Sequence, residues 1–482
     1  MFLNYGFNKY SNSLFYSYID KNSKLVSKWV KLKKEDLYKW EYCKENEKDA
    51  ISWDLRPLKK NYKDFELDLW KKSSSDLHRL IELLYSNMEN EDDVFSTDFS
   101  KMYFIDIETE ILDNDSNKPS NPLARILSIS IVTNDEKVIV LGLKPLSDEE
   151  ILEMEIGLNN YFGEYGTDFK IKYKQFEDEF SLLEFYVNVL MTKMKIQTGW
   201  FFNGFDLPYI LARCERLGIE TKNATGRLIK TLPPNLMQNM GDMFYYLPTK
   251  FIAVDYLELC FLYEKTVNMK ISKKLDYVAE KILGIGKIKL PSGFMEMYNN
   301  DYKNYIFYNI VDSALVMMID RYSKCFLTHI GKMKTCKCTV YDAFKDTKML
   351  QHILIYYFNK ENKFVPCDAF MLKKKNESSE FIGGWVFDGK KQFENDCVSF
   401  DFSSLYPSCI FQWNISPDTL IYRKEDVQDE DVVKNNIRTP WGAVYSKERV
   451  GIMTKIFENF YKNRKKEQFE GLEYQKMCLD IK

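Results

Sequence analysis

Apolar and polar residues alternate in a strand-like way in several short runs of the first third of the chain. The run Tyr103 to Thr109 places Asp106 and Glu108 among hydrophobic and β-branched neighbours, a pattern that predicts a buried strand. Two more apolar runs, 126–132 and 137–143, predict two further strands. Because successive side chains of a strand point to opposite faces, Asp106 and Glu108 are expected on the same face.

This pair of acids needs a compensating charge. Two carboxylates on one face in apolar surroundings repel each other and lose hydration. The usual compensation in proteins is a divalent cation, bound through hard oxygen ligands. The pair therefore predicts a Mg²⁺ or Mn²⁺ site whose remaining ligands come from elsewhere in the chain.

The pattern predicts an α/β multidomain protein. Residues 1–100 mix short aromatic strands with charged turns and one helix that begins near residue 73. After residue 100, strands alternate with helices, including an amphipathic helix over 181–194, which predicts a mixed sheet covered by helices. A strand is predicted over 397–402 and a helix from 451 to the end. The predicted domains are 1–100, 101–325, 326–380, 381–450 and 451–482.

Composition narrows the classes of function. A chain of 482 residues is long enough for roughly three domains of ~150 residues. The net charge of −3 still permits nucleic-acid binding, because a local basic groove suffices. Scattered cysteines and no apolar run of ~20 residues favour a cytoplasmic protein without a membrane span. Cys336 and Cys338 stand without a neighbouring His, which favours ordinary thiols over a zinc site.

Two later motifs carry further acids. Asp206 follows an apolar run and precedes Pro208 and a helical pattern, so by itself it also fits a structural helix cap. Tyr308 and Asp312 are four residues apart on a predicted helix and share a face. By themselves they also fit a core aromatic and a solvated acid.

Taken together, these motifs resemble the 3′–5′ proofreading exonuclease of family B DNA polymerases, which has an RNase H-like fold. The resemblance implies that two Mg²⁺ or Mn²⁺ ions are held by four carboxylates, those of Asp106, Glu108, Asp206 and Asp312. It also implies that Tyr308 helps to orient the attacking water. Two ions about 4 Å apart can activate that water and stabilise the leaving oxygen.

The run Asp401 to Ser408 is similar to palm motif A of the same family, DxxSLYPS. The resemblance implies that Asp401 is a catalytic metal ligand and that Phe402 also binds metal. It implies that the backbone from Phe402 to Tyr406, with Leu405 as a substrate-binding residue, cradles the incoming triphosphate. Tyr406 would pack under the sugar and exclude a 2′-hydroxyl.

The helix after Gly451 is similar to the first fingers helix of the family. The resemblance assigns Arg464 to the triphosphate, and a guanidinium suits bidentate phosphate binding. The family often has a Lys four residues later, where this chain has Gln468, and a solvated basic helix end remains the alternative. Lys482 is a candidate for the Lys of fingers motif B.

The runs 414–419 and 18–22 are similar to the T-even-phage branch of the family, whereas fingers motif B (KxxxNSxYG) and the palm motif YxDTD do not occur. We therefore expect the N-terminal half of a split phage polymerase, or a truncated one, in the host cytoplasm. It would supply the exonuclease and would synthesise DNA only with a C-terminal partner chain. Expected ligands are primer-template, single-stranded DNA and dNTP, and a sliding clamp is a candidate partner. A free-standing exonuclease and a non-catalytic replisome scaffold are the alternatives.

Overall fold

A computed structural model describes most of the chain in two compact units. Unit 1 comprises residues 1–31 and 88–352, and unit 2 comprises 32–87 and 353–482. No helix among the described residues is both long and apolar enough to cross a membrane. The described residues are 1–62, 74–112, 117–233, 244–264, 272–289, 293–365 and 398–480, except positions 9, 10, 12, 23, 37, 90, 97, 98, 100, 232, 399, 403 and 425.

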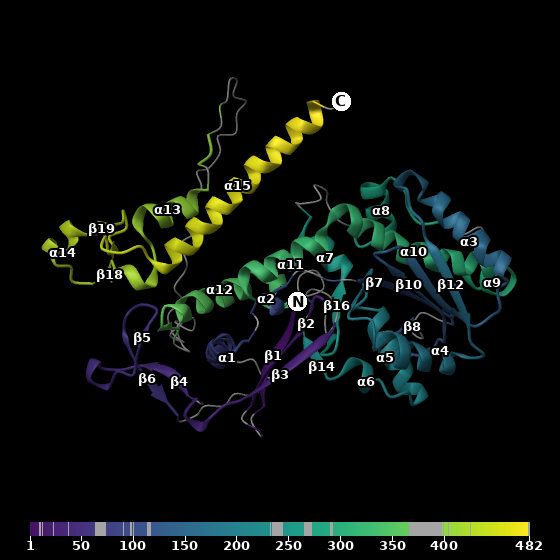
Figure 1. Cartoon of the computed structure of the whole chain (residues 1–482), viewed down its shortest axis with the longest axis horizontal. Coiled ribbons are helices and arrows are strands. Elements are labelled where there is room, and N and C mark those ends of the chain that lie inside the picture. The colour runs from purple at the N-terminus through teal and green to yellow at the C-terminus, as the bar shows by residue number, and fades with distance from the viewer. Residues whose placement is uncertain are drawn as a thin grey trace, which may run out of the picture. The chain divides into compact units, whose positions relative to one another are not determined.

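A six-stranded mixed sheet forms the centre of unit 1 (Figure 1). Strand β7 is antiparallel to β10 and parallel to β13, which confirms the predicted mixed α/β sheet. The two strands predicted over 126–132 and 137–143 are β10 and β11. The sheet order is β12 (Lys170–Gln175), β11 (Lys137–Gly142), β10 (Ile126–Thr133), β7 (Tyr103–Thr109), β13 (Ile196–Gly199) and β16 (Ile252–Asp255).

The two faces of β7 differ in chemistry. Ile105 and Ile107 belong to an apolar core shared with α4 (Glu179–Phe185), the π-helical η4 (Tyr186–Met191) and α5 (Asp206–Leu217). The helix predicted over 181–194 is thus an α-helical segment followed by a π-helical one. The opposite face of the sheet packs against α10 (Tyr302–Ser323), which contacts both β7 and β10 (Figure 1). The predicted alternation along β7 is confirmed, because the acids lie on the α10 face.

One glycine allows β13 to lie against β7. A Cβ atom added at Gly199 would overlap the carbonyl oxygen of Ile105. The chain then turns through Phe201, whose backbone is left-handed with a φ of 64°. Helix α5 starts at Asp206 and ends before Gly218, a left-handed cap with a φ of 75°. This turn therefore delivers Asp206 to the end of β13, next to β7.

The remaining elements of unit 1 include further groups of paired strands. Strands β1, β2 and β3 form a separate antiparallel sheet, and β14 pairs with β15 as a hairpin. Their bounds are β1 (Phe2–Asn8), β2 (Ser13–Ile19), β3 (Leu25–Lys31), α2 (Glu91–Val94), β8 (Asn117–Lys118), β9 (Asn121–Pro122), α3 (Asp148–Tyr161), α6 (Lys222–Thr225), β14 (Leu228–Thr231), β15 (Tyr245–Pro248), α7 (Tyr256–Leu262), α8 (Leu275–Leu283), α9 (Phe294–Asn300) and α11 (Cys325–Cys336).

Unit 2 contains two small sheets and the long helix α15 (Ile452–Asp480). The predicted early helix is α1 (Ser74–Ser86), and the predicted helix after residue 451 is α15, so both are confirmed. Helix α12 (Asp346–Lys360) leads into this unit from unit 1. The other bounds are β4 (Lys39–Tyr42), β5 (Ala50–Ser52), β6 (Pro57–Asn61), β17 (Lys363–Phe364), α13 (Leu405–Trp413), β18 (Leu420–Tyr422), α14 (Glu430–Asn435), β19 (Ile437–Arg438) and β20 (Val444–Tyr445).

The strand predicted over 397–402 is wrong for the positions of this run that the structure describes, 398 and 400–402, none of which is in a strand. Phe400 is 92% exposed and Phe402 is 76% exposed. An apolar strand is stable only when a neighbouring strand pairs with its backbone and a core covers its side chains. Among the described residues, no strand pairs with this run and no core covers Phe400 and Phe402.

The start of α15 is held by the segment 414–419. The N–H of Gly451 donates to Asn414 Oδ1 at 2.8 Å, and the next N–H groups donate to Asp418 and to the Ser416 hydroxyl, each at 3.2 Å. All three accepting side chains are buried. They satisfy the N–H groups that the first turn of a helix leaves without partners, so this segment caps α15.

Candidate metal centre

Three of the four predicted carboxylates converge in unit 1. One oxygen atom each of Asp106, Glu108 and Asp312 lies within 4.8 Å of the other two. Strand β7 supplies the first two, which are two residues apart, and α10 supplies the third where it crosses that face of the sheet. The same-face placement predicted for Asp106 and Glu108 thus puts both acids opposite the buried helix residue Asp312.

Asp206 lies beside this cluster. Its Oδ1 accepts the N–H of Ile107 on β7 at 3.2 Å, and its side chain is only 3% exposed. The helix-cap interpretation of Asp206 is wrong, because Phe205 occupies the N-cap position and Asp206 is already helical. The carboxylate is therefore turned toward the strand that carries the other two acids.

The four carboxylates raise one another's pKa, because each negative charge makes ionisation of its neighbours less favourable. Burial, and then the charge of Asp312, raise the pKa of Asp106 to about 7. Burial, followed by the charges of Asp106 and Asp312, raises the pKa of Glu108 well above its ordinary value. The pKa of Asp206 is raised well above its ordinary value by burial and then by Asp106. Neighbouring carboxylates whose pKa values are raised in this way are stabilised by a cation that binds them.

The donor set fits a hard divalent ion. All four groups offer carboxylate oxygens, the ligands that Mg²⁺ and Mn²⁺ prefer. Oδ1 of Asp312 is buried and has no hydrogen-bond partner. Such an oxygen is costly to bury unless something binds it. The cluster can therefore accept a metal without breaking a hydrogen bond at this atom.

Lys287 is a member of the site that the sequence did not reveal. Its ammonium lies 2.5 Å from Asp312 Oδ2 and 3.5 Å from the hydroxyl of Tyr308. Burial by itself would lower the pKa of Lys287, but the charges of Asp312 and Asp106 outweigh it and raise that pKa. The four acids indicated that a cation should lie near them. That signal could not identify Lys287, because this lysine lies in an irregular segment without a periodic pattern.

Tyr308 stands one helical turn before Asp312 on α10. Burial, and then the charge of Asp312, raise the pKa of its phenol above the ordinary value. The phenol therefore keeps its proton at neutral pH and can donate a hydrogen bond. Its ring meets Phe294 edge-on, with the ring centres 6.2 Å apart.

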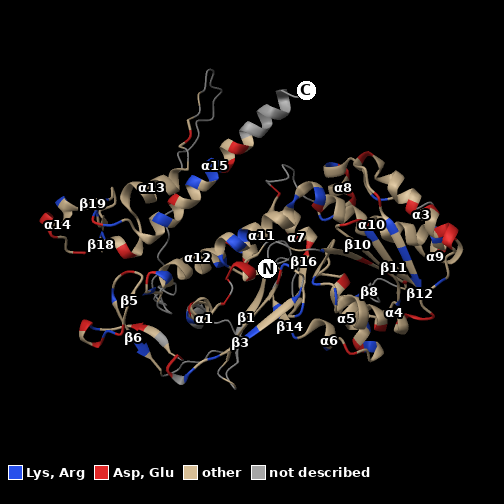
Figure 2. Ribbon diagram, in the orientation of Figure 1, with Lys and Arg blue, Asp and Glu red and all other residues tan. Residues whose placement is uncertain are grey.

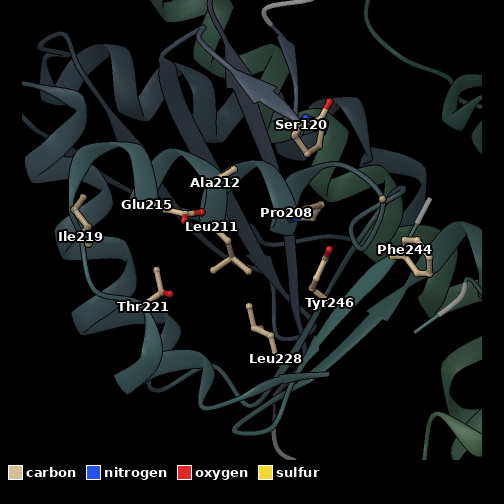
Figure 3. A pocket seen from close by; sticks show the side chains of 12 residues that line it. Ser120, Pro208, Leu211, Ala212, Glu215, Ile219, Thr221, Leu228, Phe244 and Tyr246 are labelled. Atoms are coloured by element: carbon tan, nitrogen blue, oxygen red, sulfur yellow. The ribbon is translucent and has the colours of Figure 1, made fainter. Parts of the chain in front are cut away.

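A cavity of about 820 Å³ lies along α5, the helix that begins at Asp206 (Figure 3). Pro208, Leu211 and Glu215 line one side of it. Phe244, the residue before β15, and Tyr246, the second residue of β15, line the other. The lining is mostly apolar with two aromatic rings, which suits flat, partly apolar groups such as nucleobases.

The predicted palm and fingers residues lie in unit 2. Asp401, Phe402, Leu405 and Tyr406 lie at or just before the start of α13 and are exposed, Tyr406 by 82%. Arg464 is exposed on α15, where residues of both charges follow one another along the helix (Figure 2). The described part of unit 2 contains no second cluster of three acids. Lys482 lies outside the described residues, and the roles of all these residues stay predictions.

Sequence comparisons find two family matches. Residues 66–278 match the family described as DNA polymerase family B, exonuclease domain, and residues 337–474 match DNA polymerase family B. The first match includes Asp106, Glu108 and Asp206, and it ends before Lys287, Tyr308 and Asp312.

Curated relatives agree with these matches. The DNA-directed DNA polymerase of Escherichia phage RB69 is 27% identical over 303 residues, which are 60% of this chain and 33% of the relative. The corresponding enzyme of Enterobacteria phage T4 is 29% identical over 254 residues, 52% of this chain and 27% of the relative. DNA polymerase 1 of Sulfolobus acidocaldarius is 25% identical over 319 residues, 61% of this chain and 32% of the relative. The chain thus spans about a third of the length of these relatives.

Proposed function

Because the chain belongs to family B of the DNA polymerases, we propose that its carboxylate cluster is a 3′–5′ exonuclease centre that removes nucleotides from single-stranded DNA ends. The observation that carries this proposal is the convergence of Asp106, Glu108 and Asp312 within 4.8 Å. The partnerless buried oxygen of Asp312 and the adjacent carboxylate of Asp206 support it.

We propose Mg²⁺ or Mn²⁺ as the cofactor, held by Asp106, Glu108, Asp206 and Asp312. When bound, a pair of such ions supplies an activated water and offsets charge on the phosphate. The protonated phenol of Tyr308 would orient the attacking water by a hydrogen bond. The ammonium of Lys287 would remain near the phosphate and reduce the repulsion between that anion and the acids.

The cavity along α5 is the proposed route for the DNA strand. Its position next to the helix that carries Asp206 would bring a frayed 3′ end toward the carboxylates. Phe244 and Tyr246 are the proposed stacking platforms, because every base offers a flat face to an aromatic ring.

Digestion of a single-stranded oligonucleotide tests the exonuclease proposal. With a 5′ label and Mn²⁺, the full chain should produce a ladder that shortens from the 3′ end, and chelation should abolish it. The double variant that carries both Asp106→Ala and Glu108→Ala should be inactive. The control variant Glu184→Ala, at an exposed acid on α4, should retain the activity. Metal-independent cleavage, or full activity of the double variant, would contradict the proposal.

We further propose that DNA synthesis uses Asp401 together with a second palm carboxylate. A second acid is needed because two metal ions require more than one palm carboxylate. It would come from a segment with fingers motif B and the YxDTD motif, either as a continuation of this polypeptide or as a separate chain. Primer extension that appears only when such a segment is supplied, and that is lost in Asp401→Ala, would support this proposal.

A further inference from the structure

Asn309 connects the sheet to one of the metal-site acids. It lies on α10 between Tyr308 and Asp312 and is fully buried. Its amide nitrogen Nδ2 donates to Asp106 Oδ2 at 2.7 Å. On the other side, the hydroxyl of Ser128 on β10 donates to Asn309 Oδ1 at 3.0 Å. A chain of hydrogen bonds thus runs from Ser128 through Asn309 to Asp106.

The direction of this chain of hydrogen bonds follows from the groups themselves. An ionised carboxylate can only accept, so the NH₂ group of Asn309 must face Asp106. The amide oxygen then faces Ser128, and because this oxygen also only accepts, the hydroxyl must be the donor. A second contact fixes the helix at this position, since Ser130 donates to the backbone carbonyl of Asn309 at 2.8 Å.

Dedicated donors hold three of the four acids. Asn309 holds Asp106, the N–H of Ile107 holds Asp206, and the ammonium of Lys287 holds Asp312. Asn309 is the one neutral side chain among these donors. It therefore orients its acid without bringing a charge that competes with a metal ion.

We propose that Asn309 is a positioning residue, held by Ser128, which fixes the direction of the Asp106 carboxylate and thereby strengthens binding of divalent metal. This inference rests on the proposed function, because it presupposes that the cluster binds metal. Without the amide, repulsion from Asp312 and Glu108 would favour rotation of the Asp106 carboxylate away from the cluster. Groups that orient a metal ligand in this way typically contribute about 10- to 100-fold to metal affinity.

Calorimetric titration of the full chain with Mn²⁺, without DNA, tests the inference. Asn309→Leu keeps a side chain of similar size but removes the donor, and its Mn²⁺ affinity should fall by about 10- to 100-fold. Ser128→Ala leaves the amide in place but unsupported and should cause a smaller fall. Ser17→Ala is the matched control, because Ser17 is also a buried serine of a strand but lies on β2, in a separate sheet from the acids. Its affinity should equal that of the wild type.

A second readout separates positioning from general damage to the fold. The exonuclease rate of Asn309→Leu should be low at limiting Mn²⁺ and should recover when Mn²⁺ is saturating. An unchanged Mn²⁺ affinity in both Asn309→Leu and Ser128→Ala would overturn the inference while leaving the proposed function intact. If Asn309→Leu does not fold, Ser128→Ala decides alone. Failure of the wild-type chain to bind Mn²⁺ would instead overturn the proposed function, and this inference with it.

Discussion

The ammonium of Lys287 lies 2.5 Å from Oδ2 of Asp312, inside the cluster formed by Asp106, Glu108 and Asp312. The aspartate side chain is 4% exposed and the lysine side chain 31% exposed, so the lysine can withdraw toward solvent while the acid cannot. The lysine thus offsets part of the negative charge of the cluster by itself, and bound metal would offset the rest.

Replacing this lysine should destabilise the protein most when metal is removed. Lys287→Met leaves the Asp312 carboxylate buried without its cation, and we expect the free energy of unfolding to fall by about 1–3 kcal/mol in chelator. Mn²⁺ should restore part of that loss. Denaturant unfolding with EDTA and with Mn²⁺ measures both effects, and Lys289→Met, at an exposed lysine two residues later, is the control. Equal stability of Lys287→Met and wild type in EDTA would contradict the expectation.

Stability in chelator should fall as pH rises from about 4 to about 7. Burial, and then Asp312, raise the pKa of Asp106 from 3.8 to about 7. Between these values the folded protein keeps a proton that the unfolded chain has lost, so rising pH favours unfolding. Mn²⁺ should reverse the slope, because it binds the deprotonated acid.

Unfolding titrations across this pH range measure the slope, and Asp106→Asn should reduce it. A part should remain, because burial, and then Glu258, raise the pKa of Asp255 to about 7 as well. A slope that is unaffected by both Mn²⁺ and Asp106→Asn would show that Asp106 does not titrate in this range.

Removal of one hydroxyl should slow the exonuclease without weakening metal binding. Tyr308→Phe keeps the ring beside Phe294 but loses the proposed donor to the attacking water. A hydrogen bond to a charged or reacting group is worth about 1.5–3 kcal/mol, so the single-turnover rate should fall by about 10- to 100-fold. Tyr322→Phe, at an exposed tyrosine of the same helix, should behave as wild type. An undiminished rate in Tyr308→Phe would remove Tyr308 from the proposed mechanism.

Loss of an aromatic ring from the cavity along α5 should weaken DNA binding more than turnover. Tyr246 is 41% exposed and lines that cavity. Base stacking on an aromatic side chain is worth about 1–3 kcal/mol, so Tyr246→Ala should raise the Kd for a single-stranded oligonucleotide by about 5- to 100-fold. Fluorescence anisotropy in EDTA measures this Kd. Tyr277→Ala, which removes a similarly exposed ring on α8, is the matched control, and equal affinities of the two variants would argue against this route for the strand.

Residue patterns within single strands and helices were sufficient to predict several features of the site. The alternation of a strand placed Asp106 and Glu108 on one face, and the helical spacing placed Tyr308 one turn before Asp312. Both regularities depend on backbone geometry within a few residues. The strand predicted over 397–402 shows the limit of the same reasoning, because a strand also needs a partner that its own residues do not specify.

The sequence by itself predicted a mixed sheet that carries Asp106 and Glu108 on one face, and its resemblance to a known family predicted that Asp206, Tyr308 and Asp312 join them. Only the tertiary structure decided what each acid touches. The N–H of Ile107 on Asp206, the ammonium of Lys287 on Asp312 and the amide of Asn309 on Asp106 join residues that are 99, 25 and 203 positions apart. Such contacts depend on how helices and strands pack against one another across the sheet, and no periodicity within a single element encodes that packing.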